Sequence, residues 1–107
     1  MRTGDCFEAA ARELMKLGPH SGAELVHAEV CGQGELAGIT LGHAWVEVGG
    51  VTLDYSNGKE IEIPAELYRA IGNVDAIGNE YRYTWTEAMA QLVEHEHWGP
   101  WDLETAH

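Results

Sequence analysis

The chain has 107 residues, and its six basic and eighteen acidic side chains give it a formal charge of −12. This length fits one domain over residues 1–107, and the negative charge argues against a protein that binds nucleic acid through its phosphates. No apolar run approaches the roughly 20 residues that span a bilayer, and no apolar leader follows Met1, so we expect a cytoplasmic protein that does not bind membranes.

The first predicted element is a helix over residues 5–17. Asp5 stands where a helix N-cap is expected, and Glu8 follows at the spacing of a capping box. Apolar side chains recur at helical spacing after it, and Gly18-Pro19 ends the segment. The chain therefore opens with an amphipathic helix.

Strand patterns occupy the middle of the chain. Apolar, aromatic and β-branched residues predict strands over residues 25–31, 42–48, 51–56, 60–64 and 80–84. A glycine-rich loop covers residues 32–38, and Gly49-Gly50 has the form of a two-residue hairpin turn. Residues 65–79 fit either helical turns or a strand, and both remain open.

A second helix is predicted over residues 87–97, with Thr86 as its N-cap and Gly99-Pro100 at its end. The order of helix, strands and helix predicts an α+β domain on an antiparallel sheet. We expect the first helix on the site face of this sheet and the last helix on the opposite, apolar face. Trp98, Trp101 and Leu103 are expected to pin the C-terminal segment onto the domain.

The hairpin at residues 42–56 has six apolar or aromatic residues on one face and these residues on the other: His43, Trp45, Glu47, Thr52, Asp54 and Ser56. This mostly polar face is either exposed to solvent or one wall of a site. A two-residue turn pairs Val48 with Val51 and His43 with Ser56. Asp54 is then one diagonal step from His43, a backbone distance of roughly 7–8 Å, so we predict a hydrogen bond that fixes the tautomer of the histidine.

The two cysteines receive different predicted roles. Cys6 lies in the first turn of a helix, where free backbone N–H groups and the helix dipole favour an anion, and a neighbouring histidine would make it a nucleophilic thiolate. The alternative is that Cys6 is a small buried apolar residue, His43 a surface histidine and Asp54 a turn residue. Cys31 ends a strand and is expected to be inert, without a disulfide to Cys6 in a reducing cytosol.

Two segments carry a family resemblance. "HAWVEVGGVTLD", residues 43–54, resembles the His–Asp segment of the transglutaminase-like, papain-like cysteine hydrolase superfamily, and "GDCFEAA", residues 4–10, has the place of its nucleophilic cysteine. The resemblance implies a compact papain-like or transglutaminase-like domain in which Cys6 is the nucleophile, His43 the general base and Asp54 the orienting carboxylate. The whole chain, with its "GPWDL" segment, is also similar to small proteins of tailed bacteriophages, which implies a phage setting and no particular activity.

Some polar and aromatic residues outside the triad are further candidates for a site. Gln33 could donate to an oxyanion, as glutamines do in papain-like sites, or be a solvated loop amide. Trp45 is expected to shield His43 from water and to pack against the first helix. His95 and His97 point about 200° apart on a helix, so we expect no metal site and no other cofactor.

These expectations combine into a predicted function, thiol-dependent acyl transfer on a protein or peptide substrate. Peptidase, deamidase, amidase and transglutaminase-like reactions share this chemistry and remain open, as does the oligomeric state. The alternative is a non-catalytic acidic protein of phage origin that blocks a basic surface on a host protein. An enzyme needs an open groove at Cys6, whereas such a binding protein needs a contiguous acidic face.

Overall fold

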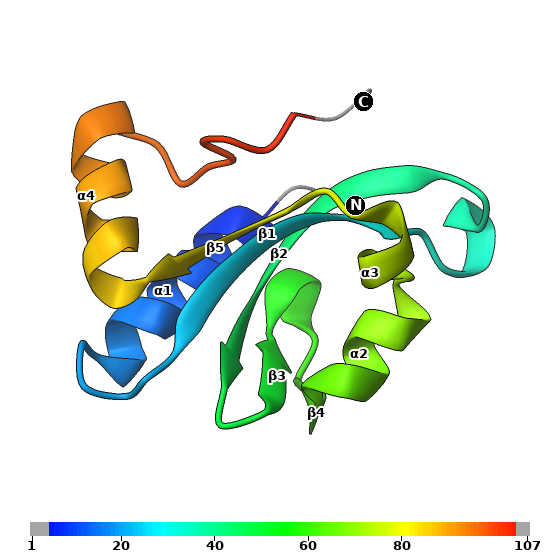
Figure 1. Cartoon of the computed structure of the whole chain (residues 1–107), viewed down its shortest axis with the longest axis horizontal. Helices are drawn as coiled ribbons and strands as arrows, with labels where there is room; N and C mark the ends of the chain where they lie inside the picture. The colour runs from blue at the N-terminus through cyan, green and yellow to red at the C-terminus, as the bar shows by residue number, and fades with distance from the viewer. Residues whose placement is uncertain (1–4, 105–107) are drawn as a thin grey trace.

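Five antiparallel strands form one sheet in the computed structural model of the chain, which describes residues 5–104 (Figure 1). The strands, in the spatial order β4-β3-β2-β1-β5, are β1 (Glu24–Cys31), β2 (Thr40–Val48), β3 (Val51–Asp54), β4 (Ile61–Pro64) and β5 (Glu80–Thr84). The helices are α1 (Cys6–Leu17), α2 (Ala65–Ile71), α3 (Val74–Ile77) and α4 (Trp85–His95), with short 3-10 turns η1 (Gly34–Leu36) and η2 (Ser56–Gly58). The predicted α+β domain with an N-terminal helix on an antiparallel sheet and a C-terminal helix is confirmed.

The predicted glycine turn joins β2 to β3. The two residues of Gly49-Gly50 have φ values of 57° and 79°, a region that glycine adopts without the steric cost of a Cβ. Val48 pairs with Val51, as a two-residue turn requires. The predicted pair of His43 with Ser56 is wrong, because β3 ends before Ser56, which begins η2.

Helices α1 and α4 pack on the same face of the sheet. Their buried side chains form one core cluster with side chains of β1, β2 and β5, which includes Cys6, Ala10, Leu14, Leu25, Ala44, Val46, Tyr83 and Ala88. Ala44 and Val46 belong to the apolar face of the hairpin, so the expectation that the last helix covers this face is confirmed, and the expectation that the first helix lies on the site face is wrong. The reason is that the apolar side chains of α1, Ala10 and Leu14, pack on the apolar face, while α2 and α3 cover the face that carries Trp45.

The second face of the sheet is buried as well. Val26, Ala28, Trp45 and Val74 form a fully buried cluster there, and Tyr68 packs against it. The helices α2 and α3, which supply the last two of these residues, come from the stretch 65–79 that the sequence left open. The mostly polar face of the hairpin is therefore neither wholly exposed nor wholly a site wall, because two short helices cover part of it.

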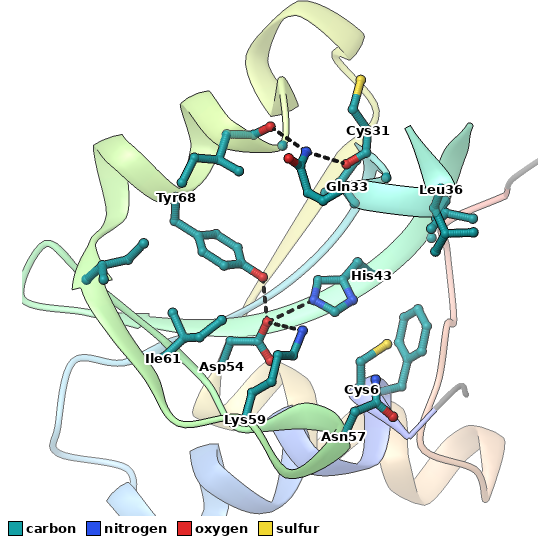
Figure 2. A pocket seen from close by; sticks show the side chains of 18 residues that line it. Cys6, Cys31, Gln33, Leu36, His43, Asp54, Asn57, Lys59, Ile61 and Tyr68 are labelled. Carbon is teal, nitrogen blue, oxygen red and sulfur yellow. Dashed lines mark hydrogen bonds and ion pairs between the residues drawn. The ribbon is translucent and has the colours of Figure 1, made fainter. Parts of the chain in front are cut away.

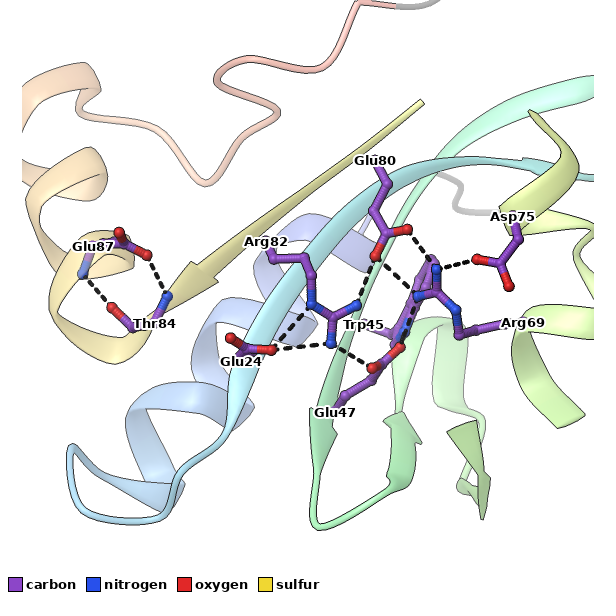
Figure 3. A network of polar contacts seen from close by, with 9 residues as sticks. All are labelled: Glu24, Trp45, Glu47, Arg69, Asp75, Glu80, Arg82, Thr84 and Glu87. Atoms are coloured by element: carbon purple, nitrogen blue, oxygen red, sulfur yellow. Dashed lines mark hydrogen bonds and ion pairs between the residues drawn. The ribbon is translucent and has the colours of Figure 1, made fainter. Parts of the chain in front are cut away.

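A cluster of carboxylates surrounds two arginines beside this second core (Figure 3). Arg69 of α2 and Arg82 of β5 both contact Glu47, at 3.3 Å and 2.5 Å, and both contact Glu80. Burial raises the pKa of Glu47, but hydrogen bonds from Arg82 and Trp45 outweigh it and hold that pKa below its usual value. The cluster links α2 to three strands, so these acidic residues are structural.

Helix ends differ from the predicted caps. Among the described residues no side chain caps α1; the Asp5 carboxylate instead accepts the backbone N–H of Asn57, at 3.0 Å and 3.1 Å, so the predicted capping box is wrong. At α4 a capping box joins Thr84 to Glu87, and the helix begins two residues before the start predicted with Thr86 as cap. No helix within residues 5–104 is long and apolar enough to cross a membrane.

The segment after α4 returns to the domain, as predicted. Leu103 is buried, and Trp101 packs against the core under α1 and α4. The Tyr83 hydroxyl donates to the Asp102 carboxylate at 2.5 Å. Figure 1 shows this segment crossing over the sheet on the side of β1 and β5.

Candidate active site

A cavity of about 740 Å³ opens beside the N-terminus of α1 (Figure 2). Its wall brings together Cys6 from α1, His43 from β2 and Asp54 from the end of β3. Lys59, just after η2, and Tyr68 of α2 line the same wall. All three residues of the predicted triad therefore lie on one cavity.

Cys6 is the first residue of α1 and is 5 % exposed. Figure 2 shows the side chains of Cys6 and His43 on the same cavity, and Cys6 is one of the groups that raise the pKa of His43. No side chain of the described residues caps the helix, so its first-turn N–H groups have no side-chain acceptor there. The Asp5 carboxylate, which could repel a thiolate, is bound to the backbone of Asn57.

Asp54 is held by several donors. Its Oδ1 accepts the backbone N–H of Ser56 at 3.0 Å and the Ser56 hydroxyl at 2.6 Å. Its Oδ2 accepts the Tyr68 hydroxyl at 2.6 Å and lies 3.6 Å from Nζ of Lys59. The same oxygen lies 3.0 Å from Nε2 of His43, which confirms the predicted hydrogen bond. A carboxylate fixed in this way orients the imidazole and leaves its Nδ1 for Cys6.

The electrostatics of the pair favour charge on both partners. Burial raises the pKa of Asp54, but hydrogen bonds from His43, Ser56 and Tyr68 outweigh it and hold that pKa far below its usual value. Burial lowers the pKa of His43, but hydrogen bonds to Asp54 and Cys6, together with their charges, raise it to about 9. An imidazolium at neutral pH therefore stands between a carboxylate and a thiol, the setting that favours a thiolate–imidazolium pair.

Trp45 lies behind the site rather than in it. Its side chain is fully buried, and its indole N–H donates to Glu47 at 2.9 Å. Its ring centroid is 6.0 Å from that of His43 and 5.1 Å from that of Tyr68. Trp45 thus covers one side of His43, but the expected contact with the first helix and the expected substrate contact are wrong, because α2 lies over this face and the cavity does not reach the indole.

Gln33 lines the cavity, but its donors are already used. Its amide nitrogen donates to the carbonyl oxygens of Cys31 at 3.3 Å and Ile71 at 3.0 Å. These bonds fix the loop before η1 against the end of α2. The expected role of Gln33 as an oxyanion donor therefore does not fit this geometry.

The sequence analysis missed Tyr68 and Lys59, and it placed Ser56 on the site face without its bond to Asp54. Ser56 had a local signal, because an aspartate carboxylate commonly accepts the backbone N–H two residues later in an Asx turn, and Asp54 forms this turn with Ser56. Tyr68 had none, since its bond to Asp54 depends on where α2 packs. Lys59 likewise reaches the site through the course of the chain after η2.

Cys31 and His97, which are the other thiol and metal candidates, do not belong to the triad. Cys6 and Cys31 are both free, and Cys31 is half-buried on the cavity wall rather than inert core packing. The Nδ1 atom of His97 accepts the N–H of Gly99 at 3.0 Å. Within residues 5–104, no three His, Cys, Asp or Glu side chains are grouped to hold a metal ion.

The arrangement contains the parts of thiol chemistry: a buried cysteine, a histidine that can carry its proton, and a carboxylate that orients the histidine. Cys6 comes from α1, His43 from β2 and Asp54 from β3, and the side chains of all three line one cavity. Comparison with protein-family models, with curated proteins and with solved structures finds no match for the chain.

Proposed function

We propose that the protein is a thiol-dependent acyl-transfer enzyme of the papain-like or transglutaminase-like kind, with Cys6, His43 and Asp54 as its triad. The observation that supports this most strongly is the ordered contact of the three side chains on one cavity, with His43 held 3.0 Å from Asp54. The resemblance of the two sequence segments supports the same roles.

In the first step the Cys6 sulfur attacks the carbonyl carbon of an amide or ester, and a C–S bond forms. The first-turn N–H groups of α1 stabilise the oxyanion of the tetrahedral intermediate. The C–N or C–O bond then breaks, and the leaving group takes its proton from the His43 imidazolium. The product of this step is a thioester on Cys6.

In the second step water or an amine attacks the thioester. His43, now neutral, takes the proton of the attacking group, and the Cys6 thiolate leaves with the electron pair of the C–S bond. Water gives hydrolysis, and an amine gives transfer. The cytoplasm is the proposed location, since the reaction needs a reduced thiol.

The cavity wall supports the enzyme over the alternative of an acidic binding protein. Asp54 is the one carboxylate among the described residues on that wall. Several other acidic side chains are engaged by Arg69 and Arg82, which reduces the acidic face that a basic partner could contact.

Alkylation by iodoacetamide at pH 7, followed residue by residue with mass spectrometry, tests the proposal. We expect His43→Ala to slow alkylation of Cys6 by at least about tenfold, because the proton acceptor is lost. Asp54→Asn should slow it less, since the imidazole remains but is no longer held by a charge.

Cys31 is the internal reference, and its alkylation rate should be equal in all three proteins. If Cys6 reacts at one rate in the wild type and in both variants, the three side chains do not act as a triad, and the acidic binding protein becomes the better account.

A further inference from the structure

The cavity beside Cys6 has both polar and aliphatic side chains in its lining. Its polar lining includes His43, Asp54 and Lys59, and Gln33 lines it at the loop before η1. Six aliphatic side chains from five elements also line it, and one of them, Ile61, pairs with Asp54 in the sheet: Val30, Leu36, Leu41, Ile61, Ile63 and Ile71. A cavity of about 740 Å³ is within the range of sites that take small molecules or single side chains.

Two of these aliphatic side chains also remain exposed. Leu36 is 47 % exposed and Ile71 is 49 % exposed, and both line the cavity. Gln33 fixes the two segments that carry them to one another, through the carbonyl of Ile71. An apolar surface held in place next to a nucleophile fits an apolar group of a substrate.

Lys59 places a positive charge on the cavity wall of a protein that is strongly acidic. The chain carries a formal charge of −12, yet Lys59 lines the cavity with Nζ 3.6 Å from Oδ2 of Asp54. The same oxygen is 3.0 Å from the ring of His43, so two cations share one carboxylate. Lys59 is 44 % exposed and can therefore also face an anion in the cavity.

From these observations we infer the substrate class: a peptide or N-acyl amino acid that ends in a bulky apolar residue with a free carboxylate. The inference rests on the proposed function. The apolar side chain contacts the aliphatic lining, and the carboxylate pairs with Lys59. In such a substrate the carboxylate is two bonds from the leaving nitrogen, and Lys59 and His43 both lie beside the same oxygen of Asp54.

The reaction is the release of that terminal residue. Cys6 attacks the carbonyl carbon that precedes it, the C–N bond breaks, and the amino acid leaves with a proton from His43. Water then attacks the thioester, His43 takes the proton of the water, and the acyl part leaves as a carboxylic acid.

Four chloroacetyl compounds test the inference without a turnover assay. They are chloroacetyl-leucine, chloroacetyl-leucinamide, chloroacetyl-glycine and chloroacetamide, which vary the apolar group and the carboxylate separately. Each reacts by the same step: the Cys6 sulfur displaces chloride at the methylene carbon, and chloride leaves with the bonding pair. Rates at Cys6 are divided by the rates of the same compounds with glutathione.

We expect chloroacetyl-leucine to react about tenfold faster than chloroacetyl-glycine and about fivefold faster than chloroacetyl-leucinamide. Lys59→Gln should bring the leucine-to-leucinamide ratio close to one, whereas Lys16→Gln on the outside of α1 should leave it unchanged. Ile71→Ser should lower the leucine-to-glycine ratio. Leu67→Ser is its matched control, since Leu67 is on the same helix, 51 % exposed, and outside the cavity.

The ratios of alkylation rates test the substrate class, whereas the dependence of the chloroacetamide rate on His43 tests the proposed function. If chloroacetamide alkylates Cys6 in a His43-dependent way but the four compounds react equally, the triad stands and the substrate class is wrong. If the ratios survive in Lys59→Gln and Ile71→Ser, these residues do not select the substrate, and the inference is again wrong. If chloroacetamide shows no dependence on His43, the proposed function itself fails.

Discussion

At the scale of single residues, the site depends on how completely Asp54 is bonded. The carboxylate is 1 % exposed, and a buried charge of this kind is stable only when hydrogen bonds replace its water. Ser56 satisfies one oxygen, while His43 and Tyr68 satisfy the other. Tyr68 is therefore a positioning residue, which acts on the reaction through the carboxylate.

Replacing Tyr68 by phenylalanine should lower the free energy of unfolding by about 1–2 kcal/mol, because a buried carboxylate oxygen loses a donor. The measurement is urea unfolding at pH 7. Tyr81→Phe is the matched control, since Tyr81 is 40 % exposed on β5, and it should change stability by less than about 0.5 kcal/mol. Equal stability of the two variants would mean that the Tyr68 hydroxyl does not stabilise the carboxylate.

At the scale of elements, His27 marks the place where β1, α1 and the C-terminal segment meet. It is fully buried, and neither ring nitrogen has a hydrogen-bond partner among the described residues. The rings of Phe7, Tyr83 and Trp101 surround it at centroid distances of 4.8, 5.1 and 4.9 Å. Burial lowers the pKa of His27 to about 4, against the opposing charge of Asp102.

Because this pKa is lower in the folded protein than the ordinary value of 6.5, the unfolded chain binds a proton more readily between pH 6.5 and about 4. Stability should therefore be complete above pH 6.5 and fall by on the order of 3 kcal/mol as the pH drops to 4. His43 acts in a different window: its pKa is raised to about 9, so its contribution is full below pH 6.5 and is lost as the pH rises towards 9.

Urea unfolding between pH 4 and 7 measures this effect. His27→Leu should flatten the acid slope without loss of stability at pH 7, since it removes two unpaired polar atoms from the core. His20→Leu, at an exposed histidine, should keep the slope of the wild type. An unchanged slope in His27→Leu would assign the acid sensitivity to another group.

Among the elements, the hairpin and α1 could be predicted from the sequence, and the helices in residues 65–79 could not. The hairpin followed from Gly49-Gly50 and α1 from its apolar spacing, because both signals are local. The stretch 65–79 stayed open, since α2 and α3 are short and are held mainly by packing on Trp45 and its neighbours. The predicted cap of α4, Thr86, is wrong, because Thr84 has the correct spacing to Glu87 for a capping box.

At the scale of the whole molecule, the sheet is covered on both faces (Figure 1). The cavity lies where α1, η2 and α2 meet the strands (Figure 2). The contact of His43 with Asp54 was predictable, because both lie on one hairpin. The prediction that Cys6 lies near His43 rests on the place of Cys6 in the first turn of a helix and on the family resemblance. Lys59 and Tyr68 depend on the paths of segments with no distinctive pattern.

The central claim is that Cys6 and His43 share a proton, and an NMR titration of the His43 ring tests it most directly. The account predicts a pKa of about 9 in the wild type, well above the ordinary 6.5, and a lower pKa in Cys6→Ala, because the thiolate partner is gone. A wild-type pKa near 6.5, or a raised pKa that Cys6→Ala leaves unchanged, would contradict the account.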